Sequence, residues 1–304
     1  MVRGAEGLAV HPRAVSAYPG AGEAILMVLA VLLLQLGIGG LLAVGAAVTG
    51  GQPGPIDPAL AALGNLVAFG VVIGWGYLRA RAREGAGRPV FPLAGGGGSV
   101  LALALLGAVG LAILSSEIDN LTRWFFPMPS VIAELMAGLF VGGVGSFLLL
   151  VVVAPVTEEL LFRGLIQRGF LGRYRKWPAL LAASALFALL HINPYQLASG
   201  FLIGVYLGWL LAGTGSLVPA LLGHAVVNAL ALLAGSDLVP DIPGFSLGPQ
   251  ELAAGSVEFQ PWWLDLLGAA LLGAAVAGLR RSFPATGEPR LAAAAAAGEA
   301  HELT

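Results

Sequence analysis

Long apolar stretches bounded by polar or charged residues follow one another along nearly the whole chain. A helix of about 20 apolar residues spans the ~30 Å hydrocarbon core of a membrane. The pattern therefore predicts an all-α, polytopic membrane protein with eight transmembrane helices. We expect them at about residues 24–49, 58–78, 99–115, 131–172, 177–192, 195–212, 216–234 and 261–279.

The fourth apolar stretch, residues 131–172, is too long for one straight crossing. At ~1.5 Å per residue it would reach roughly 60 Å, about twice the hydrocarbon thickness. It holds either two spans or one long helix that starts at the interface and bends at Pro155. The single bent helix is favoured because it places 13 of the 15 Lys and Arg residues on one side. By the positive-inside rule, that side and both termini are cytoplasmic, and the polar loops 117–130 and 235–260 face outside.

The composition also indicates a membrane protein, and it excludes some kinds of catalytic and metal-binding site. Hydrophobic residues make up 58% of the chain and charged residues only 11%, whereas a soluble domain carries about 25%. The net charge of −2 gives no basic footprint for nucleic acid, so membrane lipid is the expected surrounding. With no cysteine, disulfides, a thiolate nucleophile and Cys-built metal sites are excluded. We expect a cytoplasmic leader (1–23), a membrane domain (24–280) and a flexible cytoplasmic tail (281–304).

Three glycines recur at every fourth position within the sixth apolar stretch: Gly200, Gly204 and Gly208. Residues four apart lie on one face of a helix, and glycines let two membrane helices approach closely. We therefore expect this face to pack against a neighbouring helix.

Ionisable and amide side chains interrupt three of the apolar helices. They are Glu158, Glu159, Arg163, His191, His224 and Asn228. Such groups are costly at membrane depth and are interpreted first as a functional site. Counted from the cytoplasmic flanks, Glu158, His191 and His224 lie about 15, 22 and 12 Å deep, so they can meet within the core.

Spacing within each helix suggests individual roles. Glu159 and Arg163 share a helix face, so Arg163 can neutralise Glu159, which is equally the pattern of a structural ion pair. Glu158 points about 100° away without a cationic neighbour of its own, which suits a general base. His224 and Asn228 also share a face. Phe187 precedes His191 by four residues and places an aromatic ring beside the imidazole.

These residue types are sufficient for amide hydrolysis. A carboxylate and one histidine can hold and deprotonate a water, and a second histidine and an amide can donate hydrogen bonds to the oxyanion. No serine or cysteine nucleophile is needed. The alternative from another class is a non-hydrolytic proton-coupled transporter or scaffold that uses the same cavity. Against transport, no inverted repeat is visible.

Three motifs in register resemble the CPBP family, which comprises the type II CAAX prenyl endopeptidases and bacteriocin-processing proteins and is also called the Abi family. EELLFR at Glu158–Arg163 resembles the family's EExxxR motif. FALLH at Phe187–His191 resembles FxxxH, and HAVVN at His224–Asn228 resembles HxxxN. The resemblance covers about residues 140–233. It implies an eight-helix intramembrane protease whose site opens to the cytoplasmic side. Because the sequence shows no organelle signal, we expect the protein in a bacterial plasma membrane.

The resemblance also implies roles for the site residues. Glu158 and His191 would activate water, His224 and Asn228 would stabilise the oxyanion, and Glu159 would assist. Zn²⁺ is possible, with Glu158, His191 and His224 as three ligands and an open fourth position, but no HExxH pair is present. We expect a glutamate to activate the water without a metal, and we expect Arg163 and Phe187 to be supporting residues of the site. The expected substrate is a peptide or protein near the cytoplasmic membrane surface.

Overall fold

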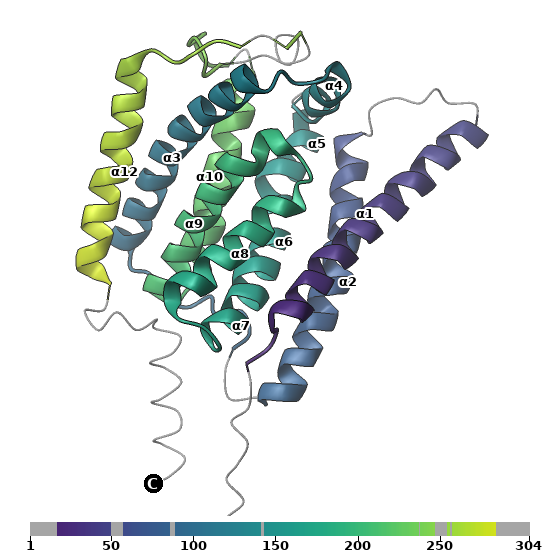
Figure 1. Cartoon of the computed structure of the whole chain (residues 1–304), viewed down its shortest axis with the longest axis vertical. Coiled ribbons are helices and arrows are strands. Elements are labelled where there is room, and N and C mark those ends of the chain that lie inside the picture. Colours follow the sequence, from purple (N-terminus) through teal and green to yellow (C-terminus); the bar gives the residue numbers. More distant parts are fainter. Residues whose placement is uncertain are drawn as a thin grey trace, which may run out of the picture.

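The computed structural model describes residues 17–49, 57–85, 89–140, 143–236, 238–246, 254–255 and 257–283. Most of the expected leader and nearly all of the expected tail lie outside these residues. Within them, every regular element is a helix, as the apolar pattern predicts. Successive long helices run antiparallel and form one bundle (Figure 1).

Within the described residues, seven α-helices lie outside the 130–171 region. They are α1 (Ala21–Val48), α2 (Pro58–Glu84), α3 (Gly98–Phe125), α8 (Lys176–Leu190), α9 (Leu197–Thr214), α10 (Val218–Ala234) and α12 (Trp262–Ser282). In the described part of the chain, six helical segments are long and apolar enough to cross a membrane. The protein is therefore a polytopic α-helical membrane protein. The predicted count of eight also includes α8 and α10, which have 15 and 17 residues.

The region predicted to be one bent helix from 131 to 172 consists of two separate pieces. The first, α4 (Ser130–Leu139), has 10 residues, or about 15 Å, and is too short to cross. The second is a continuous 29-residue helical span, Gly143–Leu171. It begins at Gly143 with φ +81°, a conformation that favours glycine. The structure therefore agrees with the prediction that this region crosses the membrane once. The prediction of one continuous helix from residue 131 was wrong, because α4 ends at Leu139.

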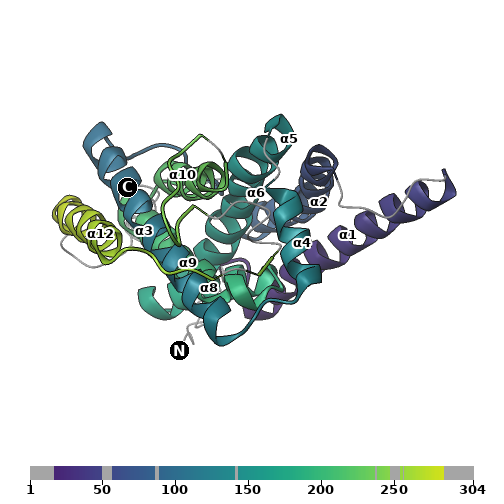
Figure 2. The same cartoon turned by 90° about the horizontal axis from the view of Figure 1, so that it is seen from above.

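The Gly143–Leu171 span changes its helical type along its length. It comprises α5 (Gly143–Phe147), the π-helix η1 (Leu148–Val153), α6 (Ala154–Glu159), the π-helix η2 (Leu160–Gln167) and α7 (Arg168–Leu171). It packs against α2, α8 and α10 near the middle of the bundle, with α1 and α12 at opposite edges (Figure 2). The two motif glutamates at its centre are thereby surrounded by helices.

The predicted polar loop 117–130 was also partly wrong, because α3 continues to Phe125. Its polar residues find partners along the helix end. The Asn120 amide donates to Gly244 O and to Glu117 Oε2, and Glu117 Oε2 also accepts from the Gln260 backbone N–H. These contacts satisfy polar groups that the sequence pattern alone assigns to a loop.

Candidate active site

Pro155 shapes the helix that carries the glutamates. In η1 the Ala154 N–H bonds to Leu149 O, five residues back. The next such donor would come from residue 155, but proline has no N–H. The Leu150 carbonyl instead accepts a hydrogen bond from Asn228 Nδ2 on α10, at 2.8 Å. π-helical turns inside α-helices are frequent at functional sites.

Glu159 lies at the centre of a buried ionic network. It is fully buried, and its Oε1 is 2.9 Å from Arg163 Nη1 and 2.9 Å from His224 Nδ1. The predicted Glu159–Arg163 contact is thus present, and it extends to α10. An ionised carboxylate only accepts hydrogen bonds, so His224 carries a proton on Nδ1. The other ring nitrogen of His224, Nε2, then faces Glu158.

Arg163 and Gln167 connect this network to the backbone of α9. Arg163 Nη2 donates to Gly204 O at 3.1 Å, and Gln167 Nε2 donates to Gly208 O at 2.7 Å. A Cβ on Gly204 would lie 3.0 Å from the Ser184 Cβ on α8. The predicted glycine face is therefore confirmed as a face of close helix approach. The role of Gln167, four residues after Arg163, was missed by the sequence analysis.

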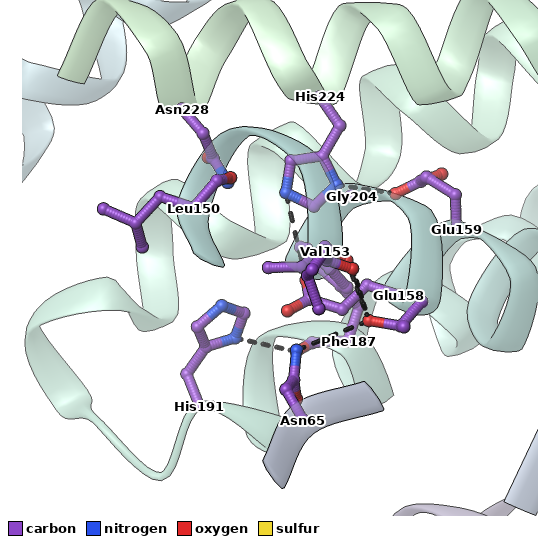
Figure 3. Close-up of polar contacts among 12 residues, drawn as sticks. Asn65, Leu150, Val153, Glu158, Glu159, Phe187, His191, Gly204, His224 and Asn228 are labelled. Carbon is purple, nitrogen blue, oxygen red and sulfur yellow. Dashed lines mark hydrogen bonds and ion pairs between the residues drawn. The ribbon is translucent and has the colours of Figure 1, made fainter. Parts of the chain in front are cut away.

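Glu158 occupies a different environment from Glu159. Its carboxylate lines a cavity, and its Oε2 lies 3.9 Å from His224 Nε2, beyond direct hydrogen-bonding distance (Figure 3). The two adjacent glutamates thus point in different directions, as their 100° helical offset predicts. Glu159 is used by Arg163 and His224, whereas Glu158 faces the cavity.

His191 ends α8 and lies next to the same cavity. Its Nδ1 is 3.1 Å from Phe187 O, so this nitrogen carries the proton and Nε2 is an acceptor in the neutral ring. The Phe187 ring meets His191 and His224 edge-on, with centroids 5.3 and 5.7 Å away. The predicted aromatic neighbour is confirmed. Ile192, the next residue, has φ +48°, an unusual backbone conformation for a β-branched side chain.

One cavity of about 370 Å³ brings the motif residues together. Glu158, His191, His224 and Asn228 all line it, although they come from three different helices. Other parts of its wall come from α3, α4 and α9. The depth count indicated only that these side chains could meet. In the structure they do meet, since all of them line one cavity.

The cavity extends toward one end of the bundle. Lining residues from the last turns of α3, from η3 (Pro194–Gln196) and from the segment after α10 lie at that end. In the other direction, Leu161, Phe162, Leu165 and Ile166 are fully buried and fill the space beyond the glutamates. The cavity is therefore closed on the side of α7.

The α7 end of the bundle carries the basic clusters that define the predicted cytoplasmic side. Arg168 pairs there with Glu84 at 2.6 Å, and Arg83 pairs with Glu23 at 2.8 Å. The cavity thus extends away from the basic end. Figure 1 shows α7 and α4 at opposite ends of the bundle. Two expectations consequently conflict: the basic end cannot be cytoplasmic while the site opens to the cytoplasm.

The alternative zinc site does not fit the side chains as they lie. Among the residues that the structure describes, no three His, Cys, Asp or Glu side chains are grouped closely enough to hold a metal ion. We derive no catalytic step through a metal.

Two polar residues near Glu158 carried no motif in the sequence. Asn65 on α2 donates from Nδ2 to Thr157 Oγ1 at 3.4 Å, and Thr157 Oγ1 donates to Val153 O at 2.8 Å. Asn65 Oδ1 accepts from Gln35 Nε2 on α1 at 2.9 Å. These contacts attach the glutamate-bearing helix to α1 and α2. The only signal in the sequence was an amide side chain within an apolar stretch.

Comparison with known proteins gives one match, and it falls on the site. Residues 140–230 match the family model described as "Type II CAAX prenyl endopeptidase Rce1-like". No curated protein and no solved structure matches the chain. The matched segment contains Glu158, His191, His224 and Asn228, the residues that meet in the cavity. The segment that holds the site is therefore similar to the type II CAAX prenyl endopeptidases that this family model describes.

Proposed function

We propose that this protein is an intramembrane endopeptidase that hydrolyses a peptide bond with a water activated by Glu158. The proposal rests on one observation: the adjacent carboxylates of Glu158 and Glu159 lie in different environments. Glu159 is buried and bonded to Arg163 and His224, whereas Glu158 lines the cavity. A carboxylate that faces a cavity beside two imidazoles is placed for proton transfer to and from a bound substrate.

The proposed reaction begins with a water held between Glu158 and His191. The His191 Nε2 acceptor and the Glu158 carboxylate each take a hydrogen bond from this water. Glu158 removes a proton as the water oxygen attacks the scissile carbonyl carbon, which forms a tetrahedral oxyanion. Protonated Glu158 then gives that proton to the leaving amide nitrogen as the C–N bond breaks.

His224 is the proposed donor to the oxyanion. In its protonated form it donates from Nδ1 to Glu159 and from Nε2 into the cavity. Glu159, itself paired with Arg163, stabilises this cation and holds the ring in one orientation. Asn228 takes second place in this step, since its amide nitrogen already donates to Leu150 O. The proposal therefore assigns the oxyanion contact first to His224.

The test is cleavage of a quenched-fluorescent peptide library by purified protein in detergent. Wild type, Glu158→Gln and Glu134→Gln are compared, each with and without a chelator. Glu134 is an exposed carboxylate of α4 that does not line the cavity, so it controls for loss of one acidic group. We expect wild type and Glu134→Gln to cleave and Glu158→Gln to be inactive but equally stable. Cleavage should survive the chelator.

The other results have distinct meanings. Equal cleavage by Glu158→Gln would exclude the Glu158 mechanism. Cleavage that a chelator abolishes and Zn²⁺ restores would make the enzyme zinc-dependent. If wild type cleaves no peptide, while proton-coupled flux in vesicles depends on Glu158, the protein is a transporter.

A further inference from the structure

The cavity has a second polar wall, most of which lies outside the segment matched by the family model. Its residues are Ser115, Asp119 and Arg123 of α3 and Ser199 of α9, and we call them the α3 wall. The three α3 residues recur at every fourth position and so share one helix face. All four line the same cavity as Glu158.

Two oxygen atoms of the α3 wall have no hydrogen-bond partner. One is Asp119 Oδ1, which is shielded from solvent, and the other is Ser115 Oγ, whose residue is 5% exposed. The Asp119 carboxylate otherwise accepts a hydrogen bond from Ser199 and interacts with Arg123. A buried acceptor without a donor is unfavourable, so the α3 wall is incomplete until an N–H or O–H group enters the cavity.

The charges around the cavity select among possible donors. The carboxylates that line it are those of Glu158 and Asp119, and the only guanidinium among its described lining residues is that of Arg123. When Glu158 and Asp119 are both ionised and the histidines are neutral, the cavity lining carries an excess of one negative charge. In a site of low dielectric constant this attracts a cation and repels an anion such as a terminal carboxylate.

We infer that the α3 wall is a substrate subsite that takes the ammonium or guanidinium group of a basic residue. The inference rests on the proposed peptidase function and adds a substrate class: peptides with Lys or Arg close to the cleaved bond. The basic group donates to Asp119 Oδ1 and Ser115 Oγ, while the scissile carbonyl lies at Glu158. Arg123 holds the Asp119 carboxylate in place through their interaction.

Binding is measured in the His191→Ala background, which keeps both cavity carboxylates and removes the proposed water ligand, so that bound peptides stay intact. The probes are fluorescein-labelled alanine–leucine octapeptides in which one lysine is moved through every position. Matched sets carry norleucine, which keeps the aliphatic chain without the charge, or glutamate at the same positions. Fluorescence anisotropy in nanodiscs reports affinity. We expect lysine to bind about tenfold tighter than norleucine at one or two positions, and glutamate to bind more weakly.

Three further variants in this background locate the preference. Asp119→Asn should remove the lysine preference. Ser115→Ala, which leaves the Asp119–Arg123 contact in place, should reduce it about threefold. Asp241→Asn removes an exposed carboxylate that does not line the cavity and should retain the full preference. Thermal unfolding of each variant verifies that it is folded.

Equal binding of lysine and norleucine peptides at all positions, or no binding at all, would overturn the inference. A preference that survives in folded Asp119→Asn and Ser115→Ala would overturn it as well. Cleavage of the same peptides by wild type is scored separately. Lysine preference that depends on Asp119 without any cleavage would keep the subsite and reject the peptidase. Cleavage without a lysine preference would reject the subsite and keep the peptidase.

Discussion

Asn228 on α10 donates a hydrogen bond of 2.8 Å to the carbonyl oxygen of Leu150 in the π-helix η1. Leu150 is the residue whose backbone donor is missing because position 155 is a proline. A side chain of the HxxxN motif thus completes the backbone of the helix that bears the EExxxR motif. Asn228 therefore supports the position of the glutamates in addition to lining the cavity.

This relationship predicts that Asn228 and Pro155 are energetically coupled. Asn228→Ala should lower the free energy of unfolding by about 1–3 kcal/mol, because the Leu150 carbonyl loses its donor. Pro155→Ala restores an N–H five residues after Leu150, so Asn228→Ala should cost less in that background. Unfolding of wild type, both single variants and the double variant gives the coupling energy.

Cleavage by the same four proteins separates this structural role from an oxyanion role. A structural Asn228 predicts that the double variant regains much of its activity. An oxyanion donor predicts a loss of roughly 10²–10³ in kcat that Pro155→Ala does not restore. Additive stability changes would contradict the Asn228–Leu150 argument.

Glu159 should act on stability and activity together. Removing its charge leaves Arg163 as a buried unpaired cation, so Glu159→Gln should lower the free energy of unfolding by about 3–5 kcal/mol. Adding Arg163→Met removes that cation and should recover stability. Activity should stay low, because His224 still lacks the carboxylate on Nδ1.

Thermal unfolding and kcat of these variants are read side by side. A stable Glu159→Gln/Arg163→Met protein with full activity would show that Glu159 serves the fold alone. A stable single variant Glu159→Gln would show that the buried ion pair contributes little to stability.

The glycine face of α9 gives a prediction with a matched control. A Cβ on Gly204 would lie within 3.0–3.3 Å of Ser184 and Phe187 atoms, so Gly204→Ala should push α9 away from α8. We expect a destabilisation of about 1–3 kcal/mol and lower activity, because Gly204 O also accepts from Arg163. Gly273→Ala on α12, where a Cβ meets nothing within 4 Å, should be tolerated. Equal melting temperatures would contradict tight α8–α9 packing.

The motif residues and the glycine face could be predicted because each depends on spacing within a single helix. Glu159–Arg163, Phe187–His191 and the Gly200–Gly208 face all follow from the four-residue repeat. Contacts between helices could not be read in this way. The Asn228–Leu150 bond requires both the π-helical register around Pro155 and the approach of α10, and neither is written in a local pattern.

The same limit explains the errors at the ends of helices. Hydropathy assigns Glu117–Phe125 to a loop, but Asn120 and Glu117 are satisfied by residues more than a hundred positions away. The helix that carries the glutamates begins at Gly143 with positive φ, a backbone conformation that hydropathy does not register. Asp119 and Ser115 carry no motif and join the cavity only through the packing of α3 against α9 and α10.

The last prediction concerns which side of the membrane the cavity faces. The basic clusters lie at the α7 end, and the cavity extends toward the opposite end. The positive-inside rule then predicts that substrate reaches the site from outside the cytoplasm, contrary to what the family resemblance implies. The absence of native cysteine makes single-cysteine labelling a direct test. Leu238→Cys reports on the cavity end and Tyr174→Cys on the basic end, both at exposed positions.

In intact cells that express each variant, a membrane-impermeant maleimide should label Leu238→Cys. It should label Tyr174→Cys only after permeabilisation. The reverse labelling would place the basic clusters outside and open the site to the cytoplasm, so that the charge argument fails and the family expectation holds. Because α8, α9 and α10 separate Tyr174 from Leu238, labelling of both variants before permeabilisation would contradict the three crossings assigned to these helices.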